Sequence, residues 1–349
     1  MHFSIIIPTL NQARKLSLCL QHLYELNFDQ ELFEVLVIDN GSTDNTKDLS
    51  LSFDNHIANL YYHYCAEPGL MAARHMGAEK ARGDVLCYLD DDSMVSKDWL
   101  NGHKESFLDE KVVISGGPCI PEYEVDPPDW VEYFWHKTEF GYCHNYLSLV
   151  DFGNKKIEID PKYIFGCNYA IRKSIFYELG GTRPDYYPEK YRHYQGSGET
   201  SLALGIQNAG LKAFYHPEAR IDHLIPETRF THEYFYFKRF FIGIGASYQW
   251  VRQNNGLDGY TKPSFSVTDE IISKIRKPLG RIKRGVIGFV KRIAIKNQEP
   301  QEILSIREKM DENFQNGYAY HQRMLEEEPK LLEWVLRDNY LGENGKLPI

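Results

Sequence analysis

Polar and acidic residues follow three apolar segments that are expected to be strands. The first segment ends in Pro8-Thr9-Leu10-Asn11, the second in Asp39-Asn40-Gly41-Ser42-Thr43-Asp44, and a later one in Asp90-Asp91-Asp92. A hard cation such as Mg²⁺ or Mn²⁺ takes oxygen ligands, few from the protein and the rest from phosphate and water. Adjacent carboxylates supply such ligands and would otherwise repel one another. A lone acidic cluster is more often a solvated turn, but three polar strand ends at one sheet edge predict a metal ion bridged to a polyphosphate.

The elements that would position these residues alternate along the first 115 residues. Apolar runs predict strands at 3–7, 33–38, 60–64 and 85–89, and helical spacing predicts helices at 12–26 and 70–81. A further helix is expected to begin at Asp44. This alternation predicts an α/β fold with a doubly wound, mostly parallel sheet, which binds ligands beyond the carboxyl ends of its strands. The pattern loosens over 117–162, which is interpreted as a long excursion over the site rather than as core.

Four motifs in this order resemble the signature series of the family 2 glycosyltransferases. The motifs are S-I-I-I-P-T-L-N, V-L-V-I-D-N-G-S-T-D, P-G-L-x-A-A-R and L-x-Y-L-D-D-D. The resemblance covers roughly residues 3–250 and implies a GT-A fold of Rossmann-like type. It also implies a metal-dependent, inverting transfer of a sugar from a nucleotide sugar, expected to be a UDP-sugar, with Mn²⁺ or Mg²⁺ as the cofactor.

The resemblance implies roles for single residues. The metal ligands that it implies are Asp92, Asp90 and His223. The residues implied to bind the nucleotide sugar are Pro8, Thr9, Asn11, Asp39, Gly69, Arg74, Asp90, Asp91 and Asn168. Within that set, Asp39 is implied to contact the base and Asn168 to lie near the transferred sugar. Each of these two residues would also suit a turn.

Inverting transfer needs a carboxylate that takes the proton of the acceptor hydroxyl. Alignment of residues 196–202 with the family's G-E-D-x-E-L puts Glu199 at the position of this base. The alternative is that Glu199 only begins a helix, where an acid favours the helix dipole. A second departure from the family is His75, which stands where Asn is most common, and its role stays open.

The charge of the chain is unevenly distributed. The net charge is −9, yet residues 271–298 contain nine basic residues and no acid. Apolar residues recur in that segment at three- or four-residue spacing, which predicts a basic amphipathic helix of the kind that lies on anionic lipid. A helix packed on the domain is the alternative. An acidic body with one basic segment argues against a nucleic-acid-binding protein.

We expect three parts: a nucleotide-sugar-binding half (1–115), an acceptor-binding half (116–255) and a helical C-terminal extension (256–349). The six cysteines are scattered without a C-x-x-C pair, which favours reduced thiols. With no apolar run of 18 residues and no signal-peptide pattern, the sequence predicts a cytoplasmic enzyme that rests on the inner face of the membrane through 271–298. The expected acceptor is a saccharide or a lipid-linked sugar, and the oligomeric state is open.

Three other functions are compatible with parts of the pattern. A sugar-1-phosphate nucleotidyltransferase would be expected to show a glycine-rich, basic loop after the first strand, and P-T-L-N-Q-A-R has no glycine. A catalytically silent nucleotide-sugar-binding or scaffolding protein stays open because Glu199-Thr200 departs from the family pattern. A retaining transferase on the same fold stays open as well.

Overall fold

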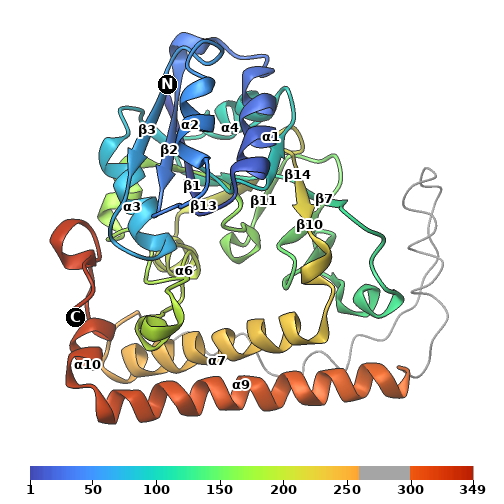
Figure 1. The fold of residues 1–349 in the computed structure, drawn as a ribbon, viewed down its shortest axis with the longest axis vertical. Coiled ribbons are helices and arrows are strands. Elements are labelled where there is room, and N and C mark those ends of the chain that lie inside the picture. Colours follow the sequence, from blue (N-terminus) through green and yellow to red (C-terminus); the bar gives the residue numbers. More distant parts are fainter. Residues whose placement is uncertain (259–298, 349) are drawn as a thin grey trace.

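Two β-sheets and a pair of long helices make up the fold (Figure 1). The computed structural model describes residues 1–258 and 299–348. The larger sheet has eight strands in the order β11-β13-β6-β12-β4-β1-β2-β3. Its strands are β1 (Phe3–Thr9), β2 (Phe33–Asp39), β3 (Leu60–Tyr64), β4 (Val85–Leu89), β6 (Val112–Gly116), β11 (Ile157–Ile159), β12 (Asn168–Arg172) and β13 (Lys212–Tyr215).

The part of this sheet that carries the polar strand ends is parallel, as predicted. β1 pairs in parallel with β2 on one side and with β4 on the other. The register places Thr9 beside Asp39, and β4 ends immediately before Asp90. Because parallel strands end at the same edge, the three polar strand ends lie together. β12 runs antiparallel between β4 and β6, so the sheet is mostly but not wholly parallel.

Short helices accompany the large sheet. They are α1 (Ala13–Tyr24), α2 (Thr46–Ser52), α3 (Leu70–Lys80), α4 (Trp99–Ser106), α5 (Lys173–Glu178) and α6 (Thr200–Asn208). The 3₁₀ turns are η1 (Gln30–Leu32), η2 (Asp129–Phe134), η3 (Pro161–Tyr163), η4 (Glu189–Tyr194), η5 (Glu227–Arg229) and η7 (Gly342–Gly345). The predicted helix start at Asp44 is wrong by two residues. The Asp44 carboxylate instead accepts the backbone N–H of Thr46 at 3.1 Å and caps α2 from outside.

A smaller, six-stranded sheet has the order β5-β14-β7-β10-β9-β8. Its strands are β5 (Ser93–Val95), β7 (Cys119–Tyr123), β8 (His136–Lys137), β9 (Tyr142–His144), β10 (Leu149–Asp151) and β14 (Ile221–Ile225). The prediction that residues 117–162 lie outside the core is therefore wrong. The aromatic side chains that interrupt the sequence pattern, Trp130 and Phe134, form a second core with Leu149 and with Phe235 of the following helix.

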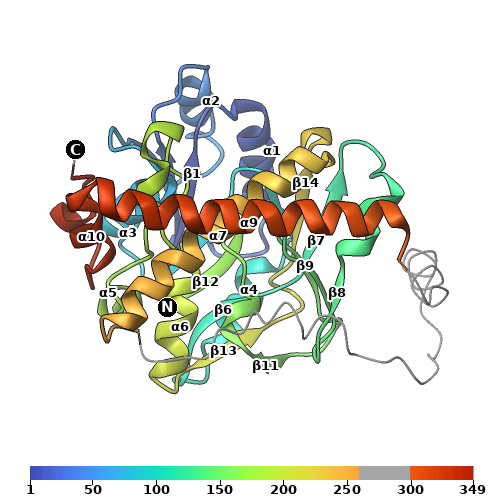
Figure 2. The ribbon, with the colours of Figure 1, turned by 90° about the horizontal axis from the view of Figure 1, so that it is seen from below.

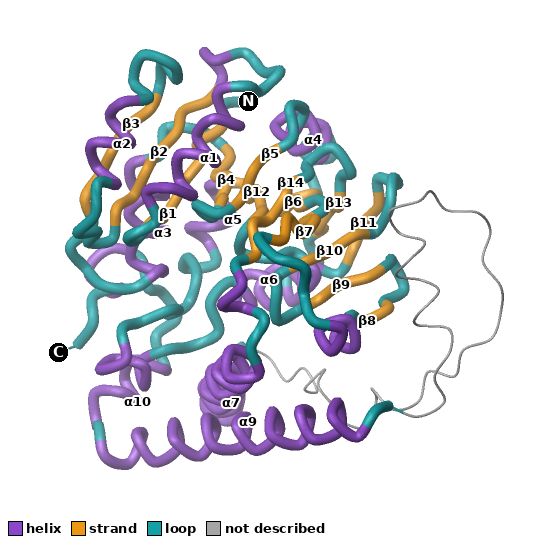
Figure 3. Tube along the Cα trace, turned by 45° about the vertical axis from the view of Figure 1, so that its right-hand side comes forward, coloured by secondary structure: helices purple, strands orange, loops and turns teal. Residues whose placement is uncertain are grey.

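Two long helices, α7 (His232–Asn254) and α9 (Gln301–Glu327), lie side by side below both sheets (Figures 1 to 3). They run in the same direction, because Arg239 pairs with Asp311 early in the helices and Ser247 contacts His321 later. α9 comes from the predicted C-terminal extension, and α7 from the predicted acceptor-binding half.

Two glycines bring the helices close together. A Cβ atom added at Gly317 would lie 1.9 Å from the carbonyl oxygen of Phe240, and one added at Gly243 would lie 2.1 Å from that of Phe314. Neither position has room for a side chain. The helix backbones are therefore in direct contact at these positions.

The chain after α9 continues through α10 (Pro329–Val335) and packs back on the rest of the protein. Arg252, at the end of α7, donates a 2.7 Å hydrogen bond to the carbonyl of Val335. The basic segment 271–298 and its predicted amphipathic helix lie outside the described residues. Within the described residues, no helix combines the length and apolar character needed to cross a bilayer. All six cysteines are free and buried.

Candidate active site

The three aspartates after β4 make contacts with different neighbours. Asp91 Oδ2 accepts a 2.7 Å hydrogen bond from the Thr9 hydroxyl at the end of β1. Burial, followed by the charge of Asp92, raises the pKa of Asp91 to about 8. Asp90 lies 3.4 Å from the guanidinium of Arg74 on α3, and Asp92 contacts residues of the smaller sheet. Each carboxylate is therefore held separately within one short loop.

Asp39 is buried beneath the turn that follows β2. Its Oδ1 accepts the backbone N–H groups of Gly41 and Ser42 at 3.1 and 2.7 Å, and its Oδ2 accepts the hydroxyl of Tyr62 at 2.7 Å. The carboxylate therefore closes the turn. The resemblance implies a contact with a nucleobase. Such a contact would have to form in addition to these hydrogen bonds or replace one of them.

The loops after β1 and β2 are tied to each other. Asn11 has a backbone φ of +54°, and its amide oxygen accepts the N–H of Thr43 at 2.7 Å while its own N–H donates to Ser42 at 2.9 Å. Asn11 thus lies at the exposed surface of the predicted nucleotide site. Pro8, in contrast, is buried inside β1 and presents no free polar group.

Gly69 begins α3 with a φ of +108°, a conformation that favours glycine. A Cβ atom at this position would lie 2.6 Å from the ring of Tyr187. Its N–H donates a 3.0 Å hydrogen bond to Asn40. Gly69 therefore allows the loop of Tyr187 to approach α3, five residues before Arg74.

Asp92, His223 and Arg229 form a compact group at the junction of the two sheets. β14 pairs with β5 so that His223 lies opposite Ser93, next to Asp92. The Nε2 atom of His223 lies 3.3 Å from Asp92 Oδ1 and 3.1 Å from Arg229 Nη1. Burial opposes ionisation of Asp92, but His223 and Arg229 outweigh it and hold the pKa of this carboxyl well below its usual value.

The proton count of this group fits a metal ion. If Nε2 is unprotonated, it can accept the N–H of Arg229, but its lone pair then faces the Asp92 oxygen 3.3 Å away. If Nε2 is protonated, it can donate to Asp92, but its N–H then faces an N–H of Arg229. One contact is unfavourable in either tautomer. A divalent cation between Nε2 and the carboxylate would remove the conflict, since imidazole and carboxylate both bind Mn²⁺. The side-chain chemistry of Asp92 and His223 therefore suits the predicted ion.

Arg74 joins the aspartate loop to Glu199. Its guanidinium is buried, lies 3.7 Å from a Glu199 oxygen and donates a 3.0 Å hydrogen bond to the carbonyl of Gly166. The N–H of Gly166 in turn donates to Glu199 at 3.1 Å. Glu199 precedes α6, yet its side chain makes no capping hydrogen bond. Helix capping therefore does not account for this glutamate, which faces the same edge as Asp90.

Sequence reasoning missed one residue of this region. Asp185 lies so close to Gly198 that a Cβ atom there would be 2.6 Å from its carboxylate, which places it beside Glu199. Asp185 belongs to no motif and lies fourteen positions before Glu199, so no local signal could have identified it.

The side chain of Asn168 points into the protein rather than into the site. Asn168 is buried; its amide oxygen accepts the indole N–H of Trp99 at 2.9 Å, and its amide nitrogen donates to the carbonyl of Ala219 at 2.8 Å. Both polar groups of this side chain are thus used within the fold, so the structure gives no support for the predicted sugar contact. The Asn168 amide instead links α4 to the chain before β14.

His75 links α3 to the C-terminal segment. Its Nε2 accepts the backbone N–H of Thr182 at 3.0 Å, so Nδ1 carries the proton and donates to the carbonyl of Tyr340 at 2.9 Å. Burial lowers the pKa of His75 to about 4. The residue that departs from the family pattern is therefore a neutral histidine that fastens residues far apart in the sequence.

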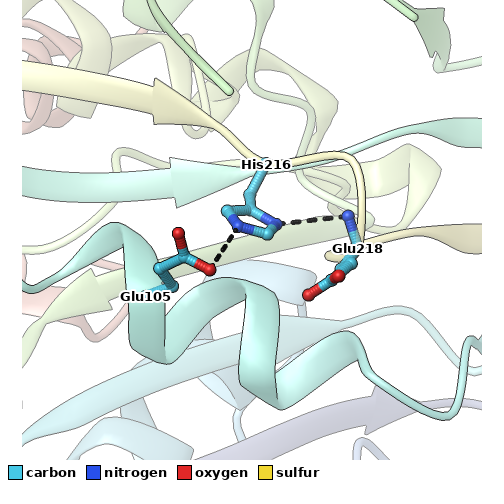
Figure 4. A group of neighbouring side chains, drawn as sticks. All are labelled: Glu105, His216 and Glu218. Atoms are coloured by element: carbon cyan, nitrogen blue, oxygen red, sulfur yellow. Dashed lines mark hydrogen bonds and ion pairs between the residues drawn. The ribbon is translucent and has the colours of Figure 1, made fainter. Parts of the chain in front are cut away.

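A second group with metal-ligating side chains lies between the end of α4 and the loop after β13 (Figure 4). Glu105, His216 and Glu218 approach one another there. The N–H of Glu218 donates to His216 Nδ1 at 3.2 Å, so Nε2 carries the proton and faces Glu105 at 3.3 Å. Lys156 pairs with the same carboxylate. The imidazole has no free lone pair, and the group is a hydrogen-bond network rather than a metal site.

The chain belongs to the family described as Glycosyl transferase family 2, whose model matches residues 4–180. It is 34% identical over 115 residues to Glycosyltransferase AglE of Haloferax volcanii, which is 33% of this chain and 38% of that protein. It is 25% identical over 182 residues to Glucosyl-dolichyl phosphate glucuronosyltransferase of the same organism, which is 50% of this chain and 54% of that protein.

The fold of the chain is the GT-A type. Its structure resembles a mannosyltransferase from Pyrobaculum calidifontis, solved in complex with GDP-Man and Mn²⁺, with a TM-score of 0.52 and 15% identity over 96% of this chain and 85% of that chain. This likeness confirms the predicted fold. The chain spans between about a third and just over half of the length of the two curated relatives.

Proposed function

We propose that the protein is a metal-dependent, inverting glycosyltransferase that moves a hexose from a nucleoside-diphosphate sugar to a saccharide or lipid-linked acceptor. UDP is the expected nucleotide. The observation that carries the proposal is the arrangement of charge along one sheet edge. Asp92, His223 and Arg229 form one group, and Arg74 and Glu199 form a second group at the other end of the Asp90–Asp92 loop. The first group suits a leaving diphosphate, and the second suits a reacting hydroxyl.

Asp92 and His223 would hold the divalent cation, with Asp90 as a further oxygen ligand. The cation, when bound, neutralises charge that develops on the leaving diphosphate. Arg229 adds a fixed positive charge at the same place, which stabilises the same developing charge. Thr9 holds Asp91 by its hydroxyl, which leaves this carboxyl positioned for the ribose.

Glu199 is the proposed base. The acceptor oxygen forms a bond to the anomeric carbon, the bond from that carbon to the phosphate oxygen breaks, and the hydroxyl proton passes to a carboxylate. Arg74 and the N–H of Gly166 fix the Glu199 side chain so that it need not reorganise during the reaction.

Relatives support the donor and acceptor classes. The archaeal relative named Glucosyl-dolichyl phosphate glucuronosyltransferase supports a lipid-linked acceptor for this chain as well, in the synthesis of a polysaccharide or glycoconjugate. A cytoplasmic enzyme that contacts the membrane through residues 271–298 would fit such an acceptor. Sedimentation with vesicles that contain anionic lipid tests this contact: binding lost on deletion of 271–298 supports it, and binding unaffected by the deletion refutes it.

Nucleotide-sugar binding and turnover test the proposed function directly. We expect UDP or GDP sugars to raise the melting temperature in the presence of Mn²⁺, because binding to the native state stabilises it. Glu199→Gln should keep this shift and lose at least about 100-fold in sugar transfer, whereas Glu189→Gln, a change on the exposed η4 turn, should keep both the shift and wild-type transfer. Binding without nucleoside-diphosphate release for any acceptor would indicate a silent binding protein. Retention of the anomeric configuration would contradict the inverting mechanism.

A further inference from the structure

The loop of Asp185 is fixed against the residue before Glu199. Gly198 has a φ of +50°, and a Cβ atom at this position would lie 2.6 Å from Asp185 Oδ2. A side chain at 198 would push the two carboxylates apart. Glycine here therefore allows Asp185 to reach the start of α6.

Backbone hydrogen bonds hold this arrangement in register. The N–H of Gly196 donates to the carbonyl of Pro184 at 2.9 Å, and the N–H of Arg183 donates to that of Gly198 at 3.3 Å. The chain just before Asp185 thus runs alongside the chain just before Glu199, and these bonds hold the two backbone segments beside each other.

Charged groups from three elements face Asp185. Glu199 comes from the start of α6, Arg74 from α3 and Lys238 from α7, while the backbone N–H of Tyr186 donates to Asp185 at 3.0 Å. Burial, followed by the charge of Glu199, raises the pKa of Asp185 to about 7, although Arg74 and Lys238 oppose the shift. Arg74 lies 3.4 Å from the carboxylate of Asp90 and 3.7 Å from that of Glu199. Asp185 therefore loses its proton close to neutral pH, and above that pH its carboxylate is free to accept one.

We propose that the base of this enzyme is a carboxylate pair, Asp185 with Glu199, and that Asp185 is a catalytic residue on which the acceptor proton ends. This inference rests on the proposed function. As the acceptor oxygen bonds to the anomeric carbon, the bond to the phosphate oxygen breaks and its electron pair leaves with the nucleoside diphosphate. The hydroxyl proton passes to the pair and stays on Asp185 until water removes it. Glu199 keeps its contact with Arg74.

Asp185 meets a requirement of general-base catalysis. A general base works best when its pKa lies near the operating pH, and burial together with the charge of Glu199 raises the pKa of Asp185 to about 7. The pair thus combines a side chain that Arg74 holds in position with a proton affinity suited to a base near neutral pH.

Transfer kinetics across pH test the pair in the full-length protein. Asp185→Asn and Glu199→Gln should each lower kcat at least about 100-fold and leave the donor KM within about threefold. The double variant should be within about tenfold of the weaker single variant, because the two groups act as a unit. In Asp185→Asn the acid limb of residual activity near pH 7 should be lost, since the carboxyl group that titrates there has been removed. The matched control, Glu189→Gln, should match wild type.

A titration that does not need activity separates this inference from the proposed function. Infrared or ¹³C-carboxyl spectra of the wild type should show a carboxyl group that titrates near pH 7, disappears in Asp185→Asn and moves lower in Glu199→Gln. Absence of that group in wild type overturns the pair even if no transfer is found. Transfer with an Asp185→Asn variant that keeps wild-type kcat and pH profile overturns the pair and leaves the proposed function intact. A wild type with the titrating group but no transfer would refute the proposed function alone.

Discussion

The guanidinium of Arg229 lies against the carboxylate of Asp92, with Nη2 2.9 Å from Oδ2. A positive side chain therefore contacts the principal candidate metal ligand. A divalent cation held by Asp92 and His223 would therefore compete with Arg229 for the Nε2 atom of His223 and for the charge of the Asp92 carboxylate.

This competition predicts the effect of Arg229→Ala on metal binding. The variant should bind Mn²⁺ more tightly in the absence of nucleotide, by about threefold to tenfold in Kd, which corresponds to roughly 1 kcal/mol. Titration calorimetry measures it. Arg220→Ala removes an exposed arginine paired with Asp222 on the same segment and serves as the control. Weaker binding of Mn²⁺ by Arg229→Ala would show that the arginine supports the ion rather than competes with it.

The neutral state of His75 predicts a pH dependence of stability. Its pKa is about 4 in the folded protein and 6.5 as the ordinary value, so the unfolded chain takes up a proton between these pH values that the folded chain does not. The His75 contribution to the free energy of unfolding is thus full above pH 6.5 and falls as the pH drops, by about 2 kcal/mol at pH 5.

Urea unfolding of wild type and His75→Gln at pH 7.5 and pH 5 isolates this contribution from those of other groups. The advantage of wild type over the variant should shrink at the lower pH. A difference that stays constant between the two pH values would mean that His75 is not held neutral.

Gly317→Ala should destabilise the contact between α7 and α9. The added methyl group would meet the Phe240 carbonyl at 1.9 Å, and separation of the helices should cost about 1–3 kcal/mol. Gly245→Ala, where the nearest atom is 3.1 Å away, is the matched control and should change the free energy of unfolding by less than about 1 kcal/mol. Denaturant unfolding measures both. Equal effects of the two substitutions would argue against close packing at Gly317.

Asn168→Ala separates a structural role from contact with the sugar. The change removes two buried hydrogen bonds, to Trp99 and Ala219, and should lower the free energy of unfolding by about 2–4 kcal/mol. The donor KM, measured on the folded fraction of the Asn168→Ala variant, should change little. A donor KM more than tenfold higher, at unchanged stability, would restore the sugar contact expected from the resemblance.

Local patterns were sufficient for the elements that carry the strand-end motifs. β1 and β2 are runs of seven buried residues, and α1 buries Leu16, Leu20 and Leu23 at helical spacing. Parallel pairing then brings Thr9 to the aspartate loop, because strand direction alone decides which ends meet.

Features that depend on distant contacts could not be predicted. The strands of the smaller sheet are mostly two to five residues long, so their alternation is too brief to recognise. Asp185 is brought to Glu199 by bonds between two loops. The role of His75 depends on Tyr340, which is 265 positions away. The motif match at Asn168 likewise gave no sign of the Trp99 indole, whose N–H donates to its amide oxygen.

Arg74 and His75 are neighbours on α3, one bound to Glu199 and the other to the carbonyl of Tyr340. Shortening the protein before Tyr340 would leave a buried imidazole N–H without an acceptor one residue from the arginine that holds the proposed base. Protease trimming or a deletion in this tail should therefore reduce turnover. For protein engineering, the segment around Tyr340 is part of the support of the site.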